Sequence, residues 1–258
     1  MSHHSNRLDR DEELEFFEKM LSGGISDRIL LIHADGGMGK SHLLREFVQE
    51  CQNKIIHVAM DFKSGGISIP ELLSRLCDAI GWEHFDNLST LIQQFNTGTT
   101  INISENILLG QNKIAIEQAL NAPDEETREK QRVAITDALF HDLRAFPKAV
   151  LIFDTFNDCD PVVAKWISGA FLTRACHAKN IIVVIAGRII PEPALDWHGI
   201  CHELVLHGIE SKHFEEYAKS KGIKVHPERI RGICDAFNGR PLPILNQLEA
   251  YNLQERHS

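Results

Sequence analysis

Five short apolar runs punctuate the chain, at residues 29–33, 55–60, 149–153, 181–186 and 202–206. Runs of this length that are rich in Ile, Leu and Val are typical of parallel strands buried on both faces of a sheet. Stretches with helical spacing of apolar residues separate the runs. Strands that alternate with helices predict an α/β fold, in which helices sandwich a parallel sheet.

The helices between these runs have recognisable ends. The first is expected over residues 7–21, with a cap near Asp9 and an end at Gly23-Gly24, because apolar residues there alternate with acids. Ser68, followed by Pro70 and Glu71, predicts the cap of another helix, which Gly81 stops. Other helices are expected from Lys40 to Gln52, over 88–95, from Asp124 to Phe146 and from Asp160 to Ala178, with Ser104 capping a short segment.

Beyond the last apolar run the pattern is wholly helical. Ser211 is expected to cap a helix that runs to Ser220, Pro227 to start one that reaches Phe237, and Pro241 to start one that reaches Leu253. This change predicts two units, an α/β unit over residues 1–207 and a small helical lid over 208–258.

The turn after the first apolar run carries the clearest chemistry. Residues 34–41, ADGGMGKS, match the phosphate-binding loop G-x-x-x-x-G-K-[ST], with Ala34 in place of the first Gly. Glycines let the backbone approach phosphate oxygens, Lys40 would reach the β- and γ-phosphates, and the Ser41 hydroxyl would bind Mg²⁺. The residues expected to bind nucleotide are Ala34, Asp35, Gly36, Gly37, Met38, Gly39, Lys40, Ser41 and His42. The alternative is a glycine-rich turn with a solvated lysine.

Asp154 follows the third apolar run and is the candidate for the Walker B aspartate, the second protein ligand of Mg²⁺. The alternative is an aspartate that only terminates a strand. A long helical span separates the second run from the third. This span favours the additional-strand class of P-loop NTPases over the kinases and GTPases.

The composition of the chain limits the cellular location and the kinds of ligand to be expected. The chain has 258 residues, a formal net charge of −9 and six scattered cysteines without a C-x-x-C pair. No apolar run approaches the ~20 residues that span a bilayer, and the N-terminus lacks the apolar core of a signal peptide. We therefore expect a cytoplasmic protein with no membrane association, no zinc site and no broad binding of nucleic acid.

Five short motifs follow one another along the chain in an order that a known protein family shares. They are Arg10-Asp11-Glu12-Glu13-Leu14, the phosphate loop at 34–41, LIFDTF at 151–156, IAGR at 185–188 and NGRPL at 238–242. Together they resemble the STAND group of signalling ATPases, which includes the NACHT and plant-resistance-type switches and bacterial relatives. The resemblance covers nearly the whole chain.

The resemblance implies a role for each motif. Arg10 would lie near the adenine, Asp154 would hold Mg²⁺, Arg188 would sense the γ-phosphate, and Pro241 would contact the base or ribose. The implied protein is a nucleotide switch that binds ATP or ADP with Mg²⁺. It would have a protein partner, or would self-associate in its ATP state.

Two features depart from the STAND pattern. The family's acid after D-T-F is Asn157 here, and an amide orients water without accepting its proton, so hydrolysis is expected to be slow or absent. Asp158 is the nearest substitute, which makes Asp154, Asn157, Asp158 and Arg188 the candidate catalytic residues. The sequence ends at Ser258, before the family's winged helix and sensor repeats, which predicts either a fragment or a stand-alone core.

Three other readings stay open. One is an AAA-type initiator or loader ATPase that acts on DNA, which the net acidity disfavours. Another is a P-loop kinase, which the long insertion before Asp154 and the C-terminal helices disfavour. The third is a degenerate scaffold that holds ADP as part of its structure.

Overall fold

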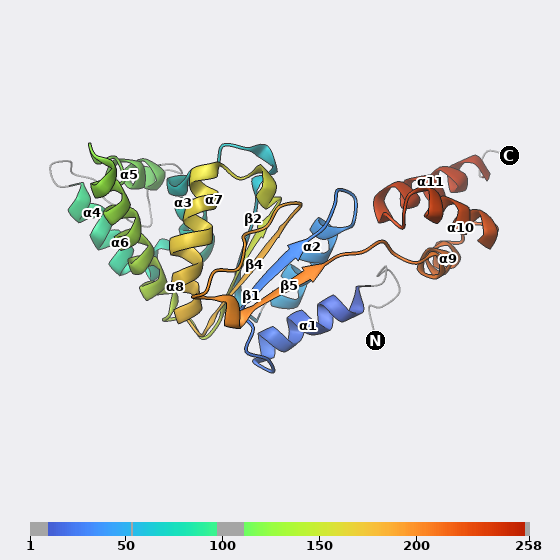
Figure 1. The fold of residues 1–258 in the computed structure, drawn as a ribbon, viewed down its shortest axis with the longest axis horizontal. Coiled ribbons are helices and arrows are strands. Elements are labelled where there is room, and N and C mark those ends of the chain that lie inside the picture. The colour runs from blue at the N-terminus through green and yellow to red at the C-terminus, as the bar shows by residue number, and fades with distance from the viewer. Residues whose placement is uncertain (1–9, 53, 97–110, 256–258) are drawn as a thin grey trace.

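The centre of the molecule is a five-stranded sheet with strand order β2-β3-β4-β1-β5 (Figure 1). The computed structural model describes residues 10–52, 54–96 and 111–255. All four strand pairings are parallel, as the alternation of strands and helices predicted. The strands are β1 (Ile29–His33), β2 (Ile56–Asp61), β3 (Ala149–Asp154), β4 (Ile181–Gly187) and β5 (Cys201–Val205).

The order of the strands places β4 between β1 and β3. In register, Ile32 of β1 faces Ala186 of β4, and Phe153 of β3 faces Ile185 of β4. The loops that leave β1, β3 and β4 therefore meet at one edge of the sheet. An extra strand between the phosphate-loop strand and the Asp154 strand is the arrangement that the additional-strand class requires.

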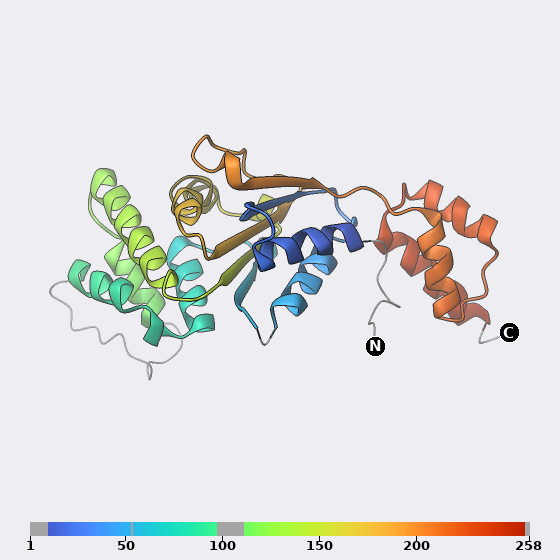
Figure 2. The same ribbon diagram turned by 90° about the horizontal axis from the view of Figure 1, so that it is seen from below.

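Helices cover both faces of the sheet (Figure 2). Successive strand residues point to opposite faces, so Leu30 and Ile32 pack in one layer while Ile29 and Leu31 pack in the other. The first layer holds α1 (Asp11–Ser22) and α2 (Lys40–Cys51). The second layer holds α3 (Ile69–Ile80), α6 (Glu125–Leu143), α7 (Pro161–Trp166) and α8 (Leu172–His177).

One end of the molecule is helical and is built around α6. Helices α4 (Asp86–Phe95) and α5 (Gln111–Ala119) pack here with α3 and α6. The predicted cap at Ser68 is confirmed, because Ser68 Oγ accepts from Glu71 N at 3.3 Å. Asp124, predicted as the start of a helix, is the cap of α6, and its Oδ1 accepts from Thr127 N at 2.8 Å. The predicted cap at Ser104 lies outside the described residues.

The single helix predicted from Asp160 to Ala178 is not regular. Helices α7 and α8 are joined by a π-helical turn over Ile167–Phe171. The Asp160 side chain caps α7 by accepting from Val162 N at 2.8 Å. Both flanking helices keep their apolar side in the core, with Trp166 of α7 and Leu172 of α8 buried together with Ile167 and Phe171 of the turn.

The other end holds three helices with a core of their own. They are α9 (Ser211–Ser220), α10 (Pro227–Ala236) and α11 (Pro241–Glu255). Their shared core consists of Ile209, Phe214, Ala218, Ile223, Ile230, Cys234, Ile244 and Leu248. None of the helices in the described ranges is both long and apolar enough to cross a membrane.

One predicted helix start differs from the structure. Ser211 is the first residue of α9 rather than its cap, and Glu210 precedes it without a side-chain cap bond. The chain enters the helix here because buried Ile209 is held by its N–H bond to Gly239 O at 2.8 Å. Helix α1 begins at Asp11, and the predicted cap at Asp9 lies outside the described residues.

Candidate functional site

The loop between β1 and α2 has the curled backbone of a phosphate-binding loop. Gly37 and Gly39 have φ values of 82° and 90°, which a residue with a Cβ rarely adopts. Gly39 is the N-cap of α2, so the helix directs its N-terminal N–H groups into the loop. Lys40 Nζ donates to the carbonyl oxygens of Ala34 and Asp35 at 2.6 and 2.9 Å. The ammonium group is thus held inside the curve of the loop.

Several charged groups from distant parts of the chain converge on Lys40. Burial lowers the pKa of Lys40 below its usual value. The carboxylates of Asp154 and Asp35 oppose this shift, and the positive charge of Arg188 adds to it. The strand order, with β4 between β1 and β3, puts the loop and the ends of β3 and β4 at the same edge of the sheet. The sequence predicted all four residues as members of one site.

Two oxygen ligands suit Mg²⁺. Asp154 ends β3, and its Oδ1 accepts from Thr155 N at 2.7 Å in a turn where Thr155 has a φ of 57°. Ser41 lies exposed in the first turn of α2. In the described part of the chain no group of three or more His, Cys, Asp or Glu side chains forms a metal cage. Mg²⁺ is commonly bound by one or two protein oxygens and substrate phosphates, so these residues fit it.

Asn157 links the ends of β3 and β4. Its Oδ1 accepts from Arg188 N at 3.0 Å, and its Nδ2 donates to Asp158 Oδ1 at 2.5 Å. Asp158 in turn lies 3.9 Å from Arg188 Nη2. Gly187 makes room for this link, because a Cβ there would lie 3.3 Å from Asn157 N and 2.5 Å from Ile189 O. Both polar atoms of the Asn157 amide therefore have protein partners.

The start of α11 lies next to the loop, while α9 and α10 lie farther from the sheet (Figure 1). A Cβ built on Gly39 would lie 3.8 Å from Pro241 Cγ, and one on Gly37 would lie 3.9 Å from Pro243 Cδ. Pro241 is buried and begins α11. The sequence predicted Pro241 as a site residue but did not single out Pro243.

Two arginines bond to the loop from outside. Arg10 Nη2 donates to Met38 O at 3.2 Å and to His207 O at 2.9 Å, and its Nη1 contacts Glu13 at 2.9 Å. Arg10 thus joins the loop to the segment that follows β5. Arg240 Nη2 lies 3.5 Å from Asp35 Oδ2.

The remaining residues predicted for the nucleotide site, His42 and Gly36, make fewer contacts with the rest of the site. His42 is 54% exposed on α2, and its Nε2 lies 3.9 Å from Glu46. Gly36 has open space around its Cα. Arg240 contacts the loop but was not predicted as a site residue, although it lies within the NGRPL motif.

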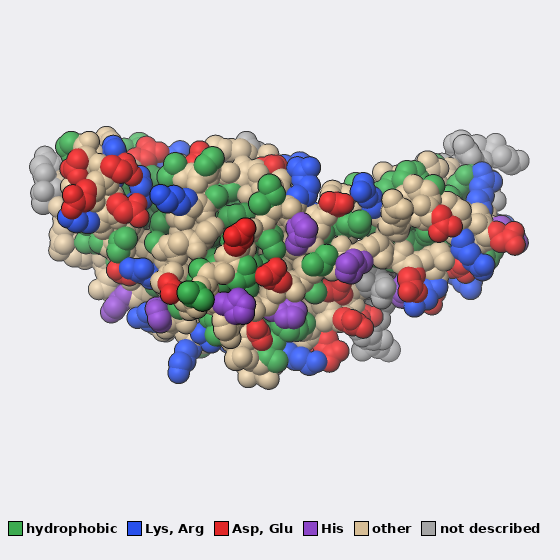
Figure 3. All heavy atoms as spheres, viewed as in Figure 1, with side chains coloured by type: hydrophobic (Ala, Val, Ile, Leu, Met, Phe, Trp, Pro, Cys, Tyr) green, Lys and Arg blue, Asp and Glu red, His purple; other side chains and the backbone are tan. Residues whose placement is uncertain are grey.

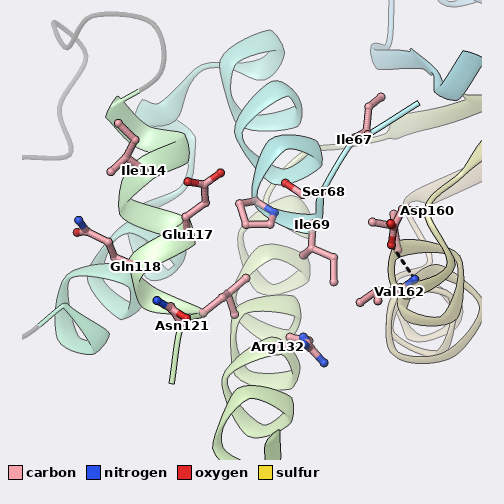
Figure 4. Close-up of a pocket in the computed structure, with 14 residues that line it drawn as sticks. Ile67, Ser68, Ile69, Ile114, Glu117, Gln118, Asn121, Arg132, Asp160 and Val162 are labelled. Carbon is pink, nitrogen blue, oxygen red and sulfur yellow. Dashed lines mark hydrogen bonds between the residues drawn. The ribbon is translucent and has the colours of Figure 1, made fainter. Parts of the chain in front are cut away.

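A separate groove of about 620 Å³ lies between α3, α5, α6 and the start of α7 (Figure 4). Its walls include Ile67, Ile69, Ile114 and Val162, and Arg132 on its floor is paired with Glu125 and Glu129 at 3.0 Å. None of the residues predicted for the nucleotide site lines this groove.

Comparisons of the sequence with known protein families and with curated proteins find no match. Solved structures are similar. A Signal Transduction ATPase with Numerous Domains (STAND) protein with a tetratricopeptide repeat sensor from Pyrococcus horikoshii has a TM-score of 0.56 and 15% identity, covering 94% of this chain. A Walker-type ATPase of Pyrococcus abyssi has a TM-score of 0.52 and 14% identity, covering 92%. Cdc6p from Pyrobaculum aerophilum has the same TM-score and identity, covering 99%.

These similarities establish the fold. The chain has the α/β fold of a P-loop NTPase, as the sequence predicted. It spans 30% of the length of the STAND protein and 65% of each of the other two chains.

Proposed function

We propose that this chain binds ATP or ADP with Mg²⁺ at the loop of residues 34–41. The observation that carries the proposal is the geometry of the loop, in which Gly37 and Gly39 have positive φ and Gly39 precedes α2. Lys40 Nζ is held within the loop, where the charges of Asp154 and Arg188 act on it. On binding, Lys40 would exchange the Ala34 and Asp35 carbonyls for phosphate oxygens. Ser41 and Asp154 would hold Mg²⁺, which neutralises phosphate charge when bound.

The role that the C-terminal helices support best is a nucleotide switch of the STAND type. Residues 208–258 would form a lid on the α/β unit of residues 1–207. Pro241 and Pro243 lie against the loop glycines. A nucleotide that enters the loop would therefore either displace these prolines or contact them. ATP and ADP that contact the lid differently would favour different lid positions. In the ATP state the chain would bind a protein partner or a second copy of itself.

Hydrolysis would be slow in this proposal. Asn157 has protein partners for both its polar atoms and lacks the acid function of the STAND motif. Asp158 is the remaining candidate base, since the Asn157 amide and Arg188 hold its carboxylate at the ends of β3 and β4. A base that is only 37% exposed and already paired would activate water weakly.

The first experiment is to purify the protein, identify the nucleotide that it carries, and measure ADP and Mg²⁺-ATP affinity by calorimetry. Bound ADP, or micromolar binding with a matching loss in Lys40→Ala, would support the proposal. Lack of binding by the wild-type protein, or unchanged affinity in Lys40→Ala, would contradict it. An assay of phosphate release from Mg²⁺-ATP then distinguishes two cases. Release of phosphate indicates a switch that hydrolyses ATP, and lack of release indicates a scaffold that only holds the nucleotide.

Action on DNA is the second candidate, because Cdc6p shares the fold. The net charge of −9 argues against it, and the face in Figure 3 shows acidic and basic side chains interspersed rather than a basic stripe. Binding to duplex DNA that weakens steeply with added salt would favour this candidate over a protein-directed switch.

A further inference from the structure

An acidic residue lies inside the proposed phosphate site. Asp35 is the second residue of the loop, its side chain is 67% exposed, and its charge acts on Lys40. A carboxylate here would repel the phosphates of a bound nucleotide. The loop therefore carries a charge that opposes its proposed ligand.

A residue of the C-terminal helices lies beside that charge. Arg240 Nη2 is 3.5 Å from Asp35 Oδ2, although the two residues are 205 positions apart in the chain. Arg240 directly precedes Pro241, which lies against Gly39 of the loop. The Arg240 guanidinium thus has Asp35 as a partner through Nη2, while its Nε is buried without a hydrogen-bond partner among the described residues.

The position of Arg240 is set by packing on both sides. Ile209 N donates to Gly239 O at 2.8 Å, and a Cβ on Gly208 would lie 2.2 Å from Asn238 O. On the other side Arg10 ties His207 O to the loop at Met38 O. The segment that leads into the lid and the segment that carries Arg240 are thus fixed near the loop.

We propose that Arg240 is a positioning residue that neutralises Asp35 when the lid is docked, so that nucleotide affinity depends on lid closure. This inference rests on the proposed function. Because linkage is reciprocal, nucleotide bound in the loop favours the docked lid by the same factor. Arg240 acts here through Asp35 and not by contacting phosphate.

The test is a double-mutant cycle that follows ADP affinity by calorimetry. Arg240→Ala should weaken binding about two- to fivefold, the range of exposed ion pairs. Asp35→Asn should bind ADP more tightly than the wild type, because the carboxylate that opposes the phosphates is gone. Arg240→Ala in the Asp35→Asn background should have no further effect, because the charge to be neutralised is gone.

Two results would overturn the inference. If Arg240→Ala weakens binding equally in both backgrounds, Arg240 contacts the nucleotide directly. If Arg240→Ala has no effect in the wild-type background, the pair does not influence the site. Failure of the wild-type protein to bind ADP is a different result, because it contradicts the proposed function and this inference together.

Arg231→Ala is the matched control. Arg231 is an exposed arginine on α10 that pairs with Glu215 at 3.3 Å and has no contact with the loop. This variant should bind ADP as the wild type does. Fluorescence energy transfer between a dye on the α/β unit and a dye on α11 supplies a second readout, measured without nucleotide. Arg240→Ala should lengthen the mean distance between the two dyes, and Arg231→Ala should leave it unchanged.

Discussion

The side-chain oxygen of Asn157 accepts a hydrogen bond from the backbone N–H of Arg188 at 3.0 Å. This bond joins the ends of β3 and β4, the two strands that carry Asp154 and the predicted sensor arginine. The same amide donates to Asp158 at 2.5 Å. A residue that departs from the STAND motif thus has a definite place in the site.

Asp158→Asn should lower phosphate release from Mg²⁺-ATP while ADP affinity stays unchanged. The variant keeps the size of the side chain but cannot accept a proton, and loss of a general base costs about 10²-fold or more. Turnover measured under saturating Mg²⁺-ATP checks this. Unchanged turnover would remove Asp158 from the mechanism.

Asn157→Glu tests whether the missing acid limits hydrolysis. Restoring the acid of the STAND motif should raise turnover if the carboxylate reaches the attacking water. The change also removes the donor to Asp158 and puts a like charge beside it, so the gain depends on geometry. A flat or lower rate would mean either that Asp158 already serves as the base or that the introduced carboxylate does not reach the water. Asp158→Asn distinguishes the two, because only the first predicts that this variant loses turnover.

Gly187→Ala should destabilise the protein by about 1–3 kcal/mol, the usual cost of overpacking. The added Cβ would lie 2.5 Å from Ile189 O, a backbone atom that cannot move aside alone. Chemical denaturation measures the change. Gly169→Ala is the control, because a Cβ there meets nothing within 4 Å, and it should be neutral or slightly stabilising.

Nucleotide affinity should fall as the pH rises through the pKa of Lys40. Burial lowers that pKa, so the ammonium loses its proton at a lower pH than a free lysine does. The charged form is the one that binds phosphate, hence affinity is full below this pKa and declines above it. Calorimetry with ADP across the alkaline range checks the prediction. Lys40→Arg, whose charge persists, should not show the decline if it binds ADP at all.

Asp154→Asn should reduce the dependence of nucleotide binding on Mg²⁺. The carboxylate is one of the two protein oxygens proposed for the metal, and an amide is a weaker ligand for Mg²⁺. The ratio of ATP affinities with and without Mg²⁺ measures this contribution. Asp160→Asn is a suitable control, because Asp160 caps α7 through Val162 N and is not proposed to bind metal.

The sequence alone determined those features that depend on neighbours in the chain. The strand at Ile29–His33 followed from a short apolar run, and the loop at 34–41 followed from glycines before Lys40. The cap at Ser68 also followed, because a cap joins atoms only three residues apart. Local patterns of this kind need no knowledge of the fold.

Tertiary structure alone decided which distant groups meet. The NGRPL motif places Arg240 before a predicted helix start, but its contact with Asp35 arises only because α11 begins against the loop. The link from Asn157 to Arg188 likewise requires β4 to lie beside β3. Strand order and helix docking result from burial of apolar surface summed over the whole chain, and a single residue's neighbours in sequence do not encode that sum.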